Sequence, residues 1–291
     1  MKRMAWGMFA LLLAGTAFAD DLGKNFEASM VVTGTITVNP DGSVNGYTLD
    51  QQGNLPPAVT KVAEATLPNW KFQPVLEEGK PIMAKSSMSV RIVAHPIDEQ
   101  HATVSITGAS FGRDAKESMG SPECKNGECL IAKSRTPPSY PIEGARNDVT
   151  GIVYLVQEIG RDGRVVRQAA KQVNLRSRWN VGAANMLAHA SLKAGRDWTY
   201  DVPTKGDEAN RDHWIVSIPV DFTLGGTYAY GQWEPYIPGP VLDLPWAKDD
   251  TNHVAANGSS DAIPDGGAPF IPDPRFVLLT PIGKDAAPGA P

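Results

Sequence analysis

The chain has 291 residues and a formal net charge of −5; 42% of its residues are hydrophobic, and it contains 28 Gly, 24 Pro and two Cys. This length exceeds one ordinary domain and indicates two modules, while the high Gly and Pro content predicts an additional tail or linker. The acidic balance argues against a nucleic acid or an anionic membrane as the main partner, and two cysteines exclude a disulfide-rich scaffold or a four-thiolate zinc site.

The N-terminal segment has the pattern of a secretory signal. Two basic residues at positions 2 and 3 precede an apolar run over residues 4–19, which ends with the small residues Ala17 and Ala19. This run is shorter than the roughly 20 residues that a helix needs to cross a bilayer, so residues 1–19 are predicted to be a cleaved signal peptide. The expected location is the periplasm, with an uncleaved inner-membrane signal anchor as the alternative.

Residues 26–98 are predicted to form a first module. Alternating apolar residues flank an Asn-Pro-Asp-Gly turn at residues 39–42, which indicates a β-hairpin. A helix is expected from Pro56, because a proline ring is tolerated in a first turn. An aromatic stretch containing Trp70, Phe72 and Pro74 follows the helix, and alternating apolar residues over 88–92 predict a closing strand. The two aromatic side chains are expected to pack beneath the helix.

Residues 99–134 are predicted to be a linker with a disulfide loop. Cys124 and Cys129 flank an Asn-Gly turn that brings their sulfur atoms together, and an exported compartment oxidises such a pair. Closing this short loop stabilises the fold by about 2 kcal/mol. The alternative is a metal or redox pair, although redox pairs usually have two intervening residues.

Residues 135–226 repeat the order of the first module. Gly151 to Ile159 is predicted to be a strand, a turn follows at residues 161–164, and Asn180 can cap a helix that ends at Gly195. The fold class is therefore predicted to be α+β, with two small modules that each have an antiparallel sheet and a packed helix in the order strand–strand–helix–strand. Residues 227–291 are rich in Pro and Gly and are predicted to form a largely irregular tail.

Short motifs occur in a constant order along the two modules. The second module carries Tyr140, Pro141, Ala145, Arg146, Gly151, Asp162 and Gly163, and the first carries Trp70, Phe72 and Pro74. In this order the motifs resemble the C-terminal domain of the TonB energy-transducer family, in two diverged copies. A TonB transducer has an uncleaved membrane helix and a Pro-rich spacer before this domain, whereas here the leader looks cleavable and the Pro-rich stretch follows the domain. The resemblance therefore does not transfer energy transduction to this chain.

The closing strand of the second module is the candidate binding element. In TonB-like domains the related edge receives a short peptide from an outer-membrane receptor, so the resemblance implies β-strand addition here. An edge strand offers unpaired N–H and C=O groups, and Pro219, which cannot donate a ladder hydrogen bond, suits an edge. The alternative is that this edge pairs with the other module or with a second copy. The candidate residues are Trp214, Val216, Ile218, Val220 and Phe222.

The sequence contains no recognisable catalytic, metal-binding or phosphate-binding motif. The five histidines have no close ligand spacing, and neither a Gly-x-Ser-x-Gly elbow nor a phosphate-binding loop is present. We therefore expect no catalytic residues, no metal and no cofactor. The sequence predicts an exported, non-enzymatic binding or adaptor protein that engages a protein partner in the cell envelope, in TonB-dependent transport. The alternatives are a periplasmic scaffold without a transport role and a periplasmic enzyme.

Overall fold

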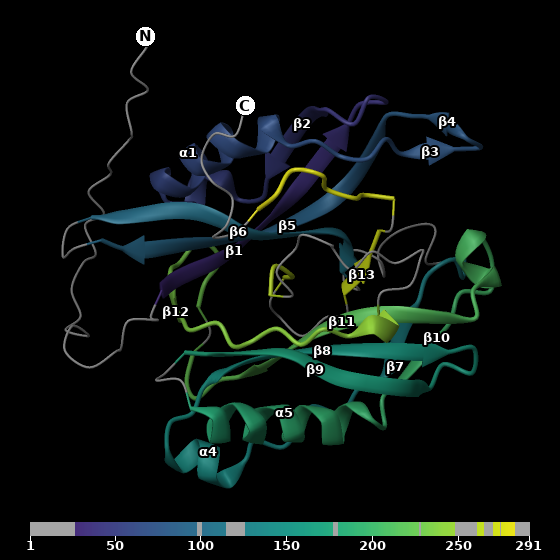
Figure 1. The fold of residues 1–291 in the computed structure, drawn as a ribbon. Coiled ribbons are helices and arrows are strands. Elements are labelled where there is room, and N and C mark those ends of the chain that lie inside the picture. Colours follow the sequence, from purple (N-terminus) through teal and green to yellow (C-terminus); the bar gives the residue numbers. More distant parts are fainter. Residues whose placement is uncertain are drawn as a thin grey trace.

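The computed structural model describes residues 27–97, 101–114, 126–176, 180–226, 228–247, 261–264, 270–273 and 275–282. Its class is α+β, as predicted, with mostly antiparallel strands and few helices. Figure 1 shows a helix on each outer side and two groups of strands that face each other between them. The predicted signal peptide, residues 1–19, lies outside the described residues.

The first module has the predicted order of hairpin, helix and closing strand. The strands β1 and β2 pair across the Asp-Gly turn, and β5 pairs with the other side of β1. The helix α1 begins at Pro57, because Pro56 is still extended and forms the N-cap. The elements are β1 (Glu27–Val38), β2 (Val44–Leu49), α1 (Pro57–Thr66), β3 (Leu76–Glu77), β4 (Lys80–Pro81) and β5 (Ala84–Pro96), with 3-10 turns at Gln52–Asn54 and Leu67–Asn69.

The second module repeats this arrangement. Its strand order β9-β8-β11 corresponds to β2-β1-β5 in the first module, and a helix precedes the last strand of each. As predicted, the side chain of Asn180 caps the helix by accepting a hydrogen bond of 3.1 Å from Ala183 N–H. The elements are α4 (Ile142–Arg146), β8 (Gly151–Gly160), β9 (Val165–Leu175), α5 (Val181–Gly195), β10 (Thr199–Asp201) and β11 (His213–Phe222), with a 3-10 turn at Asp207–Asn210. β10 pairs with β7 (Ile131–Ser134), which lies in the predicted linker just before the module.

The two Asp-Gly turns have nearly the same backbone angles and make equivalent contacts, so the similarity of the modules extends to individual atoms. Gly42 and Gly163 have φ angles of 80° and 74°. The carbonyl of each accepts a hydrogen bond of 2.8 Å, from the N–H of Phe72 and Tyr200 respectively. A Cβ atom on either glycine would lie 2.0 Å from the carbonyl oxygen of the same aromatic residue. Each turn therefore requires glycine, both for its left-handed backbone and for the close approach of a second segment.

The region predicted as a linker contains a long strand. The strand β6 (Ala102–Asp114) pairs with β5 at nine positions, so residues 99–134 are not a simple connection. The register shifts opposite Arg91, because Thr107 bulges out of β6. The bulge moves the positions that face the first core from even numbers, such as Ile106, to odd numbers, such as Phe111. This shift hides the period-two pattern by which a strand is recognised in a sequence.

The C-terminal tail joins the two modules at two places. At the first junction β12 (Glu234–Tyr236) pairs with β1, and Ile237 pairs with Leu175 at the end of β9. At the second junction β13 (Phe270–Pro272) pairs with both β6 and β11. The strand pairing therefore runs continuously in the order β12-β1-β5-β6-β13-β11-β8-β9. The tail also contains a 3-10 turn at Pro245–Ala247.

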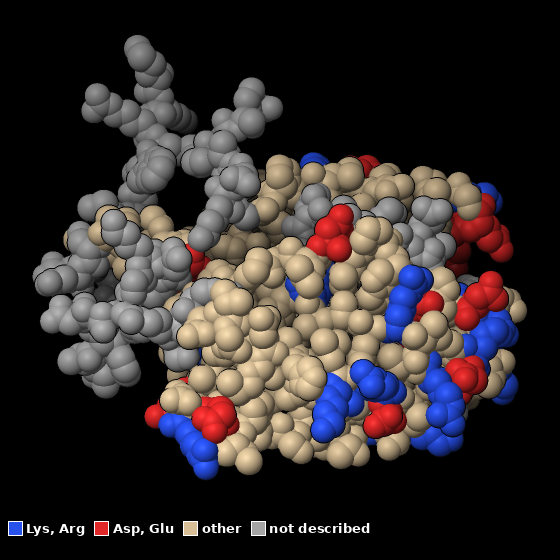
Figure 2. All heavy atoms as spheres, turned by 60° about the horizontal axis from the view of Figure 1, so that its bottom comes forward, with Lys and Arg blue, Asp and Glu red and all other residues tan. Residues whose placement is uncertain are grey.

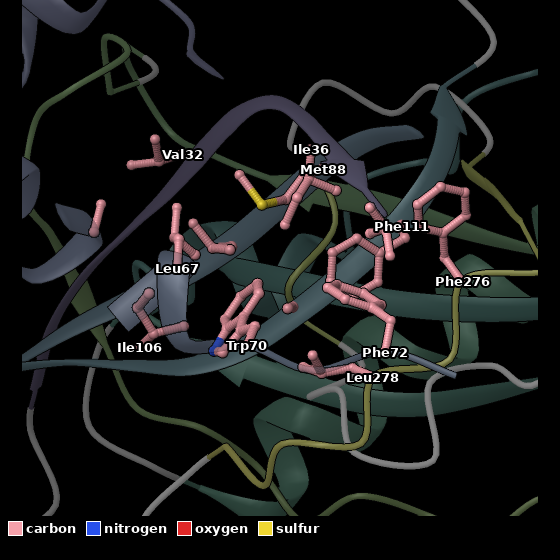
Figure 3. Packing of buried hydrophobic residues seen from close by; sticks show 14 of the residues in the cluster. Val32, Ile36, Leu67, Trp70, Phe72, Met88, Ile106, Phe111, Phe276 and Leu278 are labelled. Atoms are coloured by element: carbon pink, nitrogen blue, oxygen red, sulfur yellow. The ribbon is translucent and has the colours of Figure 1, made fainter. Parts of the chain in front are cut away.

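The tail completes the hydrophobic core of the first module. Trp70 and Phe72 are buried beneath α1, as expected, with their ring centroids 6.4 Å apart in an edge-to-face arrangement. Figure 3 shows Phe276 and Leu278 of the tail beside Phe72. The ring of Phe276 stacks on that of Phe111 at 6.3 Å. The first core is thus built partly from residues that lie more than half of the chain away from α1.

Candidate functional site

The predicted binding strand is present, but its side chains are core residues. The strand β11 pairs with β8 along its whole length, from His213 opposite Gly160 to Phe222 opposite Gly151. Pro219 lies within this ladder, opposite Tyr154. All five candidate side chains are buried in the second core, beneath α5: Trp214, Val216, Ile218, Val220 and Phe222. A partner strand could therefore use only the main chain of β11.

The outer edge of β11 differs from the corresponding edge of the first module. On β5 this edge is filled by β6 at nine positions. On β11, within the described part of the chain, the only pairing on this side joins Ser217 to Phe270 of β13. The predicted alternative was that this edge pairs with the other module or with a second copy, whereas the strand described on it, β13, belongs to the C-terminal tail. On this outer side of β11, the described residues show no further strand pair before or after Ser217.

The family-motif residues of the second module position β8 and β11. Pro141 is followed directly by α4, which contains Ala145 and Arg146. The hydroxyl of Tyr140 donates a 2.6 Å hydrogen bond to Val149 O, and its ring lies edge-on to Phe222 at 5.5 Å. These contacts attach the segment before β8 to the end of β11. The motif residues therefore act as structural elements of the module.

The remaining motif residues are also structural. A Cβ atom on Gly151 would lie 2.3 Å from the carbonyl oxygen of Asn174, so this position packs main chain against main chain. Asp162 accepts a 3.0 Å hydrogen bond from Arg164 N–H, which closes the turn that contains Gly163. In the first module Pro74 is exposed just after the buried Phe72.

A buried polar cluster lies between the two groups of strands, and the sequence analysis did not predict it. We call it the interlayer cluster. It is centred on Arg91 of β5 and Asp261 of the tail, which are both 0% exposed. Its members come from both modules and from the tail: Ser29, Arg91, Tyr154, Gln172, Asn174, Glu234, Tyr236 and Asp261.

The guanidinium of Arg91 connects both modules to the tail. It donates hydrogen bonds of 2.6 Å to the Tyr154 hydroxyl, 3.1 Å to the Ser29 hydroxyl and 2.7 Å to the main-chain oxygen of Asp261. It also lies 3.4 Å from the carboxylate of Glu234. A buried charge with several such partners is costly to disturb, because removing one partner leaves the others unsatisfied.

The carboxylate of Asp261 accepts hydrogen bonds from both sides of the tail. Asn174 donates at 2.8 Å and Gln172 at 3.4 Å, and the Tyr236 hydroxyl donates as well. Burial raises the pKa of the Asp261 carboxyl above its ordinary value, although the positive charge of Arg91 and the hydrogen bond from Asn174 oppose this effect. The interlayer cluster thus holds the tail between the modules and includes a carboxyl group whose proton is bound more tightly than usual.

A second arginine extends the same network to β11. Arg176 donates to Asp221 at 2.6 Å and to Glu234 at 3.1 Å. Burial alone would lower the pKa of Arg176, but the hydrogen bonds and charges of the two carboxylates raise it on balance. The end of β11 is therefore tied to the first junction of the tail by charged contacts.

One feature of the sequence, an arginine within an apolar strand, could have indicated the interlayer cluster. Arg91 stands between Val90 and Ile92 in a strand with apolar residues on alternate positions, so it belongs to the face opposite the first core. Such a face is normally solvated in a small antiparallel module. No local pattern marks Asp261 as its partner, since the two residues are 170 positions apart.

Other candidate chemical groups are dispersed. His95 lies 3.1 Å from Glu27, in a pair between neighbouring strands. Within the described ranges no group of three or more His, Cys, Asp or Glu side chains is arranged to hold a metal ion. Cys129 is disulfide-bonded, and Cys124 lies outside the described residues.

The outer face of α5 carries little charge. Lys193 is the one charged residue of this helix, and Val181 at its start is 64% exposed. Figure 2, which turns this side of the molecule forward, shows charged side chains mainly along its lower and right sides and a broad, largely uncharged area beside them.

No protein-family model, curated protein or solved structure matches the chain. The resemblance to TonB C-terminal domains therefore rests on the short sequence motifs alone. In the described part of the chain, no helix is both long enough and apolar enough to cross a membrane.

Proposed function

We propose that this protein is an exported, non-enzymatic binding protein that captures an extended peptide segment by β-strand addition at the outer edge of β11. The observation that carries this proposal is the contrast between equivalent edges: β6 fills the edge of β5 at nine positions, whereas β13 meets β11 at one. The first module thus provides an internal example of an added strand, whereas on the second module β13, the strand described at the equivalent position, pairs at Ser217 alone.

The resemblance to TonB C-terminal domains supplies the class of partner. We propose a short peptide segment of an outer-membrane receptor or a similar envelope protein, bound in the periplasm as part of TonB-dependent transport. Main-chain hydrogen bonds would give most of the affinity, because the side chains of β11 are buried in its own core. The partner is therefore expected to be recognised mainly through its extended backbone.

The packing of the tail makes the scaffold alternative less favourable. That alternative assigns partner capture to the aromatic, Pro-rich tail. Tyr236, Ile237, Phe270 and Phe276 of the tail are buried between or against the modules. These side chains would have to leave the core before they could contact a partner.

The test is a titration of the full chain with ten-residue peptides from the plug segments of TonB-dependent receptors. Binding is expected to shift the amide resonances of β11 and β8 in a saturable manner and to leave those of β5 unchanged. The matched controls are two N-methylated forms of the best peptide, each blocking one alternate set of amides. One set points toward β11 and the other away from it, so one form should lose binding and the other keep it. Equal binding by both forms, or no binding at millimolar peptide to a folded sample, contradicts the proposal.

A further inference from the structure

We infer that β13 is a built-in occupant of the β11 edge, and that a partner strand binds by displacing it. This inference rests on the proposed function and adds regulation to the same site. The residues Trp214 to Val220 are buried, and Phe270 of β13 lies opposite Ser217 in the middle of this stretch, so a partner strand that pairs along β11 must first replace β13 there. Among the described segments, β13 is the strand that pairs there.

β13 pairs with the first module at more positions than with the second. It pairs with β6 at three positions, from Phe270 opposite Asp114 to Pro272 opposite Gly112. The chain that follows it is bound to the segment after α1: Val277 O accepts from Gln73 N–H at 2.9 Å, and Leu279 N–H donates to Lys71 O at 2.7 Å. If the contact with β11 opens, β13 therefore stays with the first module.

The hold of β13 on the second module is small. It consists of one ladder position at Ser217, the side chain of Phe270 in a buried cluster with Ile152 and Tyr154 of β8 and Ile263 of the tail, and the side chain of Ile271 against the second core. Among the described residues, the contacts that join β13 to this module are thus concentrated on two side chains. A strand held at one ladder position is easily displaced by one that pairs at several.

The other junction is stronger. At β12 three residue pairs join the tail to β1, and Ile237 and Leu175 exchange two hydrogen bonds of 3.0 and 3.1 Å. The two modules are therefore expected to remain connected at β12 when they part at β13. We therefore expect the contact between β13 and β11 to open when a partner binds, while the β12 junction stays paired and acts as the hinge between the modules.

Competition between β13 and the partner predicts an affinity below that of an open edge. The apparent dissociation constant equals the intrinsic one divided by the fraction of molecules in which β13 has left the edge. Weakening β13 on the second module should therefore tighten peptide binding. A substitution of the same kind on the first module should not.

The test compares Phe270→Ala with Phe276→Ala in the full chain. Both phenylalanines are in the tail and buried, but Phe270 packs on β8 whereas Phe276 packs on Phe72 and Phe111 of the first core. Fluorescence anisotropy with a labelled plug peptide measures the dissociation constant. We expect Phe270→Ala to bind about five- to tenfold more tightly than wild type and Phe276→Ala to bind like wild type. Unchanged or weaker binding by folded Phe270→Ala overturns the inference.

A crosslinked variant keeps the inference testable if Phe270→Ala does not fold. Ser217→Cys combined with Phe270→Cys joins the paired positions of β11 and β13, and oxidation should abolish peptide binding until a reductant is added. The matched control, Ser89→Cys with Ser110→Cys, joins the paired positions of β5 and β6 and should bind normally in both states. Wild type in the same reductant controls for its own disulfide.

The outcomes separate this inference from the proposed function. Peptide binding that persists in the oxidised β11–β13 crosslink overturns the displacement mechanism alone. Absence of binding by wild type, both alanine variants and both reduced crosslink variants overturns the proposed function, and this inference with it.

Discussion

Substitution of Gly163 by alanine tests whether the second Asp-Gly turn is built as the structure places it. A left-handed backbone costs an alanine about 1–2 kcal/mol relative to glycine. The new methyl group would also lie 2.0 Å from the main-chain oxygen of Tyr200, so the two segments must separate and the 2.8 Å hydrogen bond between them must lengthen or break. Loss of that bond adds about 1 kcal/mol. We expect Gly163→Ala to lower the free energy of unfolding by about 3 kcal/mol.

The chain contains both a positive and a negative control for this substitution. Gly42→Ala should cost about the same as Gly163→Ala, because the equivalent contact to Phe72 is also 2.0 Å. Gly79 has a similar φ of 77°, but a Cβ atom there would meet no other part of the chain within 4 Å, so Gly79→Ala should cost only about 1 kcal/mol. Urea unfolding followed by circular dichroism measures all three variants. A loss at Gly163 no larger than that at Gly79 would refute the close approach and the equivalence of the turns.

Three further predictions concern buried polar groups. Arg91→Met should destabilise the protein by about 3–5 kcal/mol in urea unfolding, because it removes a buried charge from its partners. The control Arg146→Met changes an exposed arginine and should alter stability by less than about 1 kcal/mol. Equal effects of the two substitutions would contradict the interlayer cluster. Because burial raises the pKa of Asp261, the folded state binds its proton more tightly, so its contribution to stability is present at low pH and is lost as pH rises above the ordinary value of 3.8. The stability of wild type relative to Asp261→Asn should therefore fall as pH rises from about 4, and a constant or rising difference would refute the assignment. Tyr140→Phe should lower the free energy of unfolding by about 1 kcal/mol in the same assay, because the 2.6 Å hydrogen bond to Val149 O is lost. No measurable loss would contradict this hydrogen bond.

The elements with strong local signals could be predicted from the sequence. The Asp-Gly turns, the Asn180 cap and the alternating strands follow from backbone preferences of a few neighbouring residues, and the structure confirms them at β1, β8, α5 and β11. The strand β6 was missed because its bulge at Thr107 changes which face is buried. A single extra residue was sufficient to remove the periodicity.

The candidate edge could be predicted only in part. The position of β11 at the end of the repeat follows from the sequence, but the sequence does not show that β6 fills the edge of β5 while β13 fills so little of the edge of β11. Both are contacts between segments far apart in the chain, and neither depends on a local pattern. The interlayer cluster was missed for the same reason, because a strand arginine is normally solvated on the open face of a sheet.

The sequence by itself determined the two modules, since turn glycines, helix caps and alternating apolar residues act over a few positions. Only the tertiary structure decided what the tail does. β12 and β13 have three residues each and gain their pairing from strands that lie more than 50 positions away. Their short length gives no periodicity to read, and the burial of Arg91 and Asp261 requires both modules and the tail to be in place at once. The closure of the two modules on each other is therefore a property of the assembled chain.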